Sequence, residues 1–166
     1  LERWVRSTVD RLLAAVRRDV KPGAVRGLLY QLELGMGTVP RQSVHQEVRG
    51  LSDEQRRQLA RFGVRLGWHT LYVPRTLKPD MVRVRARLFS VFEGHTPTRA
   101  SPNPSQTAVP VASEDAFWDA IGFVVKGGLA VRADVLEACA AEVRKAGRKG
   151  DFTAPDSVRS RLGCSA

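Results

Sequence analysis

The chain has 166 residues, of which 43% are hydrophobic and 27% are charged. This composition is too apolar for a disordered tail and fits one ordinary globular domain or two small ones. No stretch reaches the roughly 18 to 20 apolar residues that a membrane-spanning helix needs, so we expect no membrane partner. The two cysteines have no CxxC partner and no nearby histidine. This pattern predicts no disulfide framework and favours a reducing, cytoplasmic location.

The net charge is strongly positive. The 27 lysines and arginines outnumber the 17 acidic residues by ten, and only five of the cations are lysines. A field of this sign attracts polyanions, and arginine suits phosphate because its planar fork donates two parallel hydrogen bonds. The charge therefore predicts a nucleic-acid partner. The alternative is an arginine-biased composition whose basic surface is only solvated.

The first third of the chain has helical periodicity. Apolar residues recur every three or four positions over residues 4–20, and the Lys-Pro-Gly sequence at 21–23 ends this pattern. A second helix is predicted over 24–34, and Gly35 and Gly37 end it. Residues 38–48 are predicted to form a loop or a short extended segment. The predicted buried face of the second helix consists of Val25, Leu28, Leu29 and Leu32.

The middle of the chain carries clearer boundary signals. Ser52 and Gln55 form a capping-box pattern, which predicts a helix from there to about Phe62. Residues 63–74 are rich in β-branched and aromatic residues with glycines between them, so we expect one strand or a bent pair. Pro79 suits the first turn of a further helix that ends near residue 92. The predicted buried stripe of that helix is Met81, Val84, Leu88 and Phe92.

The last part of the chain follows a segment rich in Pro, Ser and Thr at 94–112, which we interpret as a linker. A capped helix is then predicted over 113–121, a hairpin around Gly127 and Gly128, and helices over 135–146 and 155–162. The predicted fold is mostly α with a few short β-strands, of the α+β class. It divides into a helical basic domain at 1–93, the linker, and a small helix and hairpin unit at 113–166 that is truncated at its C-terminus.

The motifs of common enzyme classes are missing from the sequence. There is no GxxxxGK[ST] phosphate loop and no GxSxG nucleophile elbow. The three histidines stand far apart, and none has a second ligand at the i+3 or i+4 position. Adjacent carboxylates occur only where helices are predicted to begin, and the helix dipole accounts for them there. We therefore predict no catalytic residue, no metal site and no cofactor in this chain.

Positive charge concentrates between residues 56 and 87. Two pairs of arginines stand at i,i+4 spacing on predicted helices, and aromatic residues lie between them. Arginine contacts to phosphate combined with aromatic stacking are how proteins hold single-stranded nucleic acid. Alternatively, the aromatic residues are core and the arginines are solvated. The predicted contact residues are Arg56, Arg57, Arg61, Arg65, Trp68, Tyr72, Arg75, Lys78, Arg83 and Arg87, with Arg85 close by.

The C-terminal segment permits another interpretation. A short helix that ends in Leu-Gly-Cys-Ser at 162–165 resembles the first half of a helix-turn-helix unit. A DNA-binding regulator is therefore one alternative, and a non-catalytic structural or protein-docking domain is another. Because the chain ends within this unit and does not begin with Met, we expect it to be a piece of a longer protein.

Several blocks of sequence resemble one known family. The most specific block is Arg-Phe-Gly-Val-Arg-Leu-Gly at 61–67, followed by Leu-Tyr-Val-Pro at 71–74 and Leu-Lys-Pro at 77–79. It resembles the C-terminal region of alphaproteobacterial helicases akin to the mitochondrial degradosome RNA helicase. Further similar stretches lie at 26–32, 117–123, 130–137 and 162–165.

This resemblance implies a parent protein that unwinds RNA or RNA–DNA duplexes with ATP. Its ATP and magnesium would bind two motor lobes that lie upstream in the same polypeptide. None of the family's ATP-binding or catalytic positions falls on this chain. The resemblance thus implies an accessory region that holds single-stranded RNA or DNA beside the motor.

Overall fold

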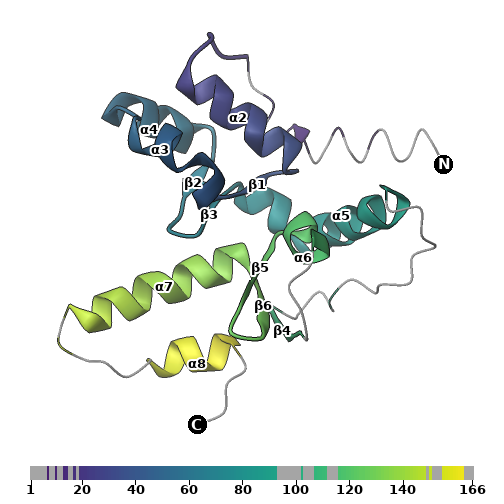
Figure 1. Cartoon of the computed structure of the whole chain (residues 1–166), viewed down its shortest axis with the longest axis vertical. Coiled ribbons are helices and arrows are strands. Elements are labelled where there is room, and N and C mark those ends of the chain that lie inside the picture. Colours follow the sequence, from purple (N-terminus) through teal and green to yellow (C-terminus); the bar gives the residue numbers. More distant parts are fainter. Residues whose placement is uncertain are drawn as a thin grey trace.

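The structure is a computed structural model. It describes residues 7, 10, 13, 14, 17, 19–92, 102, 107–111, 116–148, 150 and 155–162. These residues form a mostly helical α+β fold with two three-stranded antiparallel sheets, which confirms the predicted fold class (Figure 1). Most of the first predicted helix, over 4–20, lies outside the described residues. In the described ranges, no helix combines the length and the apolar character needed to cross a membrane.

The helix α2 (Ala24–Leu34) has the predicted bounds and buries the four predicted apolar residues. For the segment after it, a loop or a short extended segment was predicted over 38–48, and only its first residues are extended. It forms the strand β1 (Thr38–Pro40), the 3₁₀-helix η1 (Arg41–Val44) and the short helix α3 (His45–Arg49). No side chain caps the N-terminus of α3, but Val44 and Val48 are both buried in the core. Tertiary burial therefore stabilises a helix that is too short to form alone.

The helix α4 (Asp53–Arg61) begins at the predicted capping box. The Ser52 hydroxyl accepts a hydrogen bond from the Gln55 amide at 3.2 Å, and the Gln55 side chain accepts one from the Ser52 amide at 2.8 Å. The strands β2 (Arg65–Leu66) and β3 (Thr70–Tyr72) then form an antiparallel hairpin, which confirms the bent pair. Strand β3 is central, in the order β1-β3-β2. Leu71 on β3 is buried in the same core as the α2 leucines.

The 3₁₀-helix η2 (Pro74–Leu77) leads into α5 (Pro79–Phe92), which begins at the predicted proline. The predicted buried stripe of α5 is partly wrong. Phe92 is 86% exposed, whereas Val82 and Ala86 are buried beside Val84. The reason is that the middle of α5 packs against α6 (Ala116–Ile121), while its last turn extends beyond this contact (Figure 1).

The second sheet contains β4 (Ala108–Pro110), β5 (Phe123–Lys126) and β6 (Leu129–Arg132), in the order β4-β6-β5. The hairpin of β5 and β6 turns at Gly127 and Gly128, as predicted, with φ angles of 56° and 77° that glycine adopts without strain. The helices α7 (Ala133–Gly147) and α8 (Asp156–Leu162) follow.

Strand β4 corrects part of the predicted linker. Residues 108–110 pair with β6, and Val109 and Val111 pack against a buried apolar cluster of the second sheet and α6. These contacts order a segment whose composition predicted only a linker. Of the rest of 94–112, only Pro102, Thr107 and Val111 belong to the described residues.

One apolar cluster joins the two segments on either side of that linker. Val82 and Ala86 of α5 pack with Phe117 and Ile121 of α6 and with residues of the second sheet. The helix α5 therefore contributes to the same core as the second segment. The predicted division into folding units at 1–93 and 113–166 stays a prediction.

Arg85 is fully buried at this junction. The sequence had suggested instead that Arg85 lies close to the predicted contact residues. Its guanidinium donates to the carbonyl of Ala120 at 2.7 Å, to the Thr38 hydroxyl at 2.6 Å and to the carbonyl of Gly35 at 3.3 Å. Gly35 and Ala120 lie at the C-terminal ends of α2 and α6, where the helix dipoles are negative. Burial lowers the pKa of Arg85 to about 9, so the group remains a cation at neutral pH.

Candidate nucleic-acid interface

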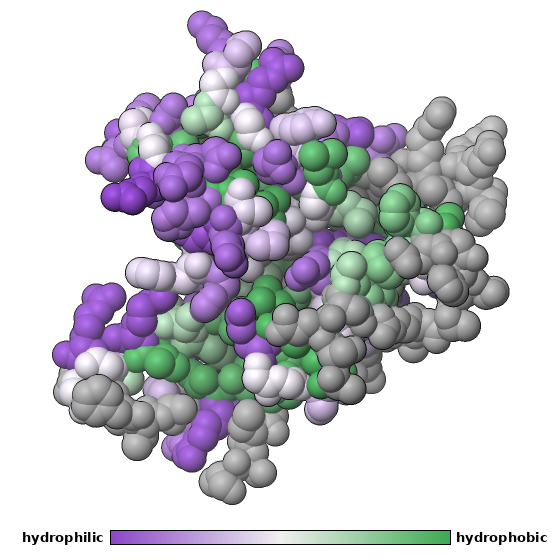
Figure 2. Space-filling view, in the orientation of Figure 1, coloured by the Kyte–Doolittle hydropathy of each residue, from purple (hydrophilic) through white to green (hydrophobic). Residues whose placement is uncertain are grey.

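A groove of about 520 Å³ opens between α4, the β2–β3 hairpin and α7. Figure 2 shows the molecule hollowed between the hydrophilic surface over α3 and α4 and the lobe that carries α7. We call it the arginine groove. Four predicted contact residues line it, together with one arginine of α7 that was not predicted. These five residues are Arg56, Arg65, Trp68, Tyr72 and Arg144.

The tip of the β2–β3 hairpin is fixed to α7 by Glu137. This carboxylate is 8% exposed and accepts backbone hydrogen bonds from Trp68 and His69, both at 2.6 Å, and from Thr70 at 2.9 Å. Gly67 permits this approach, because a Cβ there would overlap the Glu137 carboxyl group and the Thr70 carbonyl. The hairpin thus holds Trp68 in a defined position at the edge of the arginine groove.

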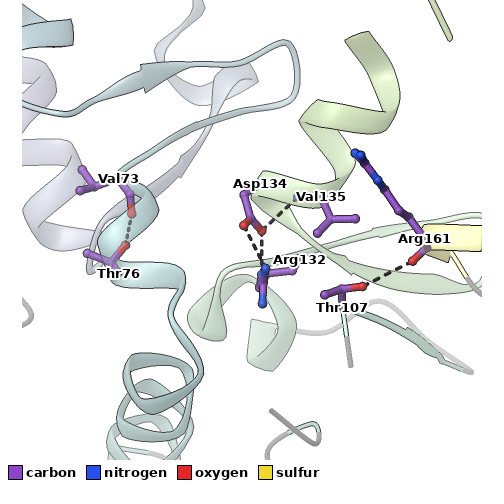
Figure 3. Close-up of polar contacts among 7 residues, drawn as sticks. All are labelled: Val73, Thr76, Thr107, Arg132, Asp134, Val135 and Arg161. Atoms are coloured by element: carbon purple, nitrogen blue, oxygen red, sulfur yellow. Dashed lines mark hydrogen bonds and ion pairs between the residues drawn. The ribbon is translucent and has the colours of Figure 1, made fainter. Parts of the chain in front are cut away.

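The other carboxylate that lines the groove is also engaged. Asp134 accepts two hydrogen bonds from the Arg132 guanidinium, at 2.7 and 3.0 Å, and one from the Val135 amide at 3.0 Å (Figure 3). It therefore acts within the first turn of α7. Because both carboxylates already have donors within the protein, much of their charge is compensated and the arginines dominate the groove.

The three arginines of the groove differ in their freedom to bind a ligand. Arg56 is half-buried, and its guanidinium donates to the carbonyls of Val48 at 2.8 Å and Leu51 at 3.3 Å. It therefore caps the end of α3 as well as lining the groove. Arg65 is exposed at the start of β2. Arg144 lies over the indole of Trp68, with its guanidinium carbon 4.0 Å from the ring centroid.

The aromatic residues have different environments. Trp68 is 65% exposed and is therefore not part of the core. The alternative interpretation of the sequence required it to be a core residue. Tyr72 is half-buried on β3. Burial raises the pKa of the Tyr72 phenol, and the nearby Asp134 and Glu137 carboxylates raise it further. The phenol therefore stays neutral and can donate a hydrogen bond at physiological pH.

The remaining predicted contact residues lie outside the arginine groove. Arg57 and Arg61 are exposed on α4 and both pair with Glu54, at 3.0 and 3.5 Å. The other four predicted contact residues are exposed on or beside η2 and α5. Figure 1 shows α5 on another side of the first sheet from α4. These exposed residues are Arg75 on η2, Lys78 after it, and Arg83 and Arg87 on α5.

The sequence did not predict the contribution of α7. Glu137 and Arg144 lie about 70 positions after the hairpin that they contact. Glu137 ends one of the stretches that carry the resemblance, at 130–137, but nothing in that stretch indicated its contact with the hairpin. A local signal was the glycine at 67, which stands where a neighbouring group approaches the backbone closely.

No protein-family model, curated protein or solved structure matches the chain. Among the described residues, no group of three or more His, Cys, Asp and Glu side chains is placed to hold a metal ion. The lining of the groove offers arginine and aromatic side chains, which bind anionic and planar groups.

Proposed function

We propose that this chain binds single-stranded RNA or DNA without sequence preference. The observation that carries the proposal is the arginine groove, which Arg65 and Arg144 line together with the exposed Trp68, whose ring lies under the Arg144 guanidinium. Guanidinium groups pair with phosphates, and an indole stacks on any base because every base has a π-face. The net charge of +10 supports the same partner through long-range attraction.

We propose further that the chain serves as the accessory C-terminal region of an ATP-dependent RNA or RNA–DNA helicase. This part rests on the resemblance of the block at 61–79, which contributes both strands of the hairpin and residues Arg65, Trp68 and Tyr72 of the groove. The motor lobes would precede the chain in the same polypeptide. The sequence upstream of Leu1 tests this, since a GxxxxGK[ST] loop is expected there and an unrelated domain would contradict it.

The binding proposal is tested by fluorescence anisotropy with a labelled single-stranded RNA of about 12 nucleotides. The double variant Arg65→Ala/Arg144→Ala removes two cations from the groove. We expect its affinity to fall at least about 10-fold at physiological salt, because each phosphate contact contributes to counterion release. Trp68→Ala should lose about 5- to 100-fold, the usual range for one stacked base.

The matched control is Arg83→Ala/Arg87→Ala, which removes the same charge from α5, an element that does not line the groove. Circular dichroism must show that all variants remain folded. Equal losses in the two double variants would contradict a binding site in the groove. Failure of the wild-type chain to bind the RNA would contradict the function itself.

A further inference from the structure

A second groove lies on the other side of the hairpin tip. Its volume is about 630 Å³, and it opens between the end of β1, the Trp68–His69 tip, α6 and β5. Trp68 lines both this groove and the arginine groove. The two hollows are therefore neighbours that meet at one exposed aromatic side chain.

The lining of the second groove suits a flat heterocycle. Pro40, Val124 and Val125 contribute apolar surface, while the exposed polar residues of the lining are Gln42, His69, Lys126 and one carboxylate, Asp119. A glutamine side chain offers both a donor and an acceptor, which is what the edge of a base requires. The lysine supplies a point charge for a phosphate.

The two grooves differ in how much of the Trp68 indole is open to a ligand. Arg144 lines only the arginine groove, and its guanidinium already covers the indole 4.0 Å from the centroid. The part of the indole that lines the second groove is therefore the part that is open to a stacked base. Glu137 fixes the backbone of the tip and Arg144 covers one part of the indole, so less of the tip has to be ordered when a base arrives.

We propose that the second groove binds an unpaired base of the same strand whose phosphates lie in the arginine groove. This inference rests on the proposed function and adds to it a separate site for one unpaired base. A duplex holds its bases in pairs, and extracting one costs unstacking and unpairing energy. The base packs against Pro40, Val125 and the indole, the Gln42 amide forms a hydrogen bond with the edge of any base because it can donate or accept, and Lys126 contacts the adjoining phosphate.

The test compares strand lengths in the double variant Gln42→Ala/Lys126→Glu. We expect its affinity for a single-stranded oligouridylate of about 12 nucleotides to fall about 10-fold. Its affinity for one of about 2 nucleotides, which the arginine groove alone can hold, should change less than about 2-fold. Wild-type protein should also bind the longer single strand more tightly than a duplex of equal length.

The matched control is Gln46→Ala/Lys21→Glu, which makes the same chemical changes at exposed positions outside both grooves. An equal loss in the control, or a duplex bound as tightly as the single strand, would overturn the inference. In either case, wild-type binding of the longer strand would leave the proposed function standing. Absence of any wild-type binding would instead refute the proposed function.

Discussion

The Glu137 carboxylate joins the two segments of the chain through three hydrogen bonds. Three backbone amides share one nearly buried carboxylate, so Glu137→Ala leaves three donors without their acceptor. We expect this change to lower the free energy of unfolding by about 3 kcal/mol, since hydrogen bonds to a charged group contribute about 1.5–3 kcal/mol. Urea denaturation followed by circular dichroism measures the change.

The control for this variant is Glu142→Ala on the same helix. The Glu142 carboxylate pairs with Arg161 at 3.1 Å, and both side chains are partly exposed, so the loss should stay below about 1 kcal/mol. If the two variants lose equal stability, Glu137 does not tie the hairpin to α7. Binding of RNA by Glu137→Ala should also weaken, because Trp68 loses its fixed backbone.

Individual side chains were the hardest feature to predict from the sequence. Arg85 stands between two exposed arginines on α5, and no local pattern separates it from Arg83 and Arg87. It is buried because the ends of α2 and α6 present carbonyl groups to it. That environment depends on how distant segments pack, which helix periodicity does not contain. Trp68 is a second example. It is exposed because it lies at the tip of the hairpin, and the sequence alone did not show where the turn between the two strands would fall.

Elements with explicit boundary signals were predicted well. The glycine end of α2, the capping box of α4, the proline start of α5 and the Gly127–Gly128 turn were all confirmed. Elements without such signals were missed, namely α3 and β4. Both are short and are stabilised by partners far away in the sequence, so local propensity gave no basis for them.

The cap of α4 gives a test at the scale of one element. Ser52→Ala removes the acceptor for the Gln55 amide, and we expect a loss of about 1 kcal/mol in the free energy of unfolding. Ser43→Ala is the control, because its exposed hydroxyl bonds only to the carbonyl of Pro40 within a turn. Thermal denaturation compares the two variants. A smaller loss in Ser52→Ala than in the control would show that packing of Leu59, not the cap, determines the start of α4.

At the scale of the whole molecule, the sequence predicted the sign of the charge but not its distribution. The ten predicted contact residues lie between positions 56 and 87 of the chain, and the fold distributes them over α4, the hairpin, η2 and its end, and α5. Only four of them line the arginine groove, where α7 adds Arg144. A run of basic residues therefore identified the region that carries the groove, while tertiary packing selected which side chains meet there.

The salt dependence of binding distinguishes a groove from a general basic surface. Each phosphate contact on a single strand contributes about −0.7 to the slope of log affinity against log salt. If the strand follows the arginine groove, Arg65→Ala/Arg144→Ala should reduce the magnitude of the slope by about 1.4. Arg57→Ala/Arg61→Ala should change it much less, because both arginines already pair with Glu54 on the outer surface of α4.

The measurement is a titration of single-stranded RNA at several salt concentrations between about 50 and 200 mM, with wild type and both double variants. Equal reductions in the two variants would indicate that phosphates spread over the whole basic surface, as the run of arginines in the sequence suggested. A wild-type slope near zero would favour the structural or protein-docking alternative, since a bound polyanion must release counterions. The predicted result is a difference between the two variants, because only one pair lies beside the aromatic residues that order the strand.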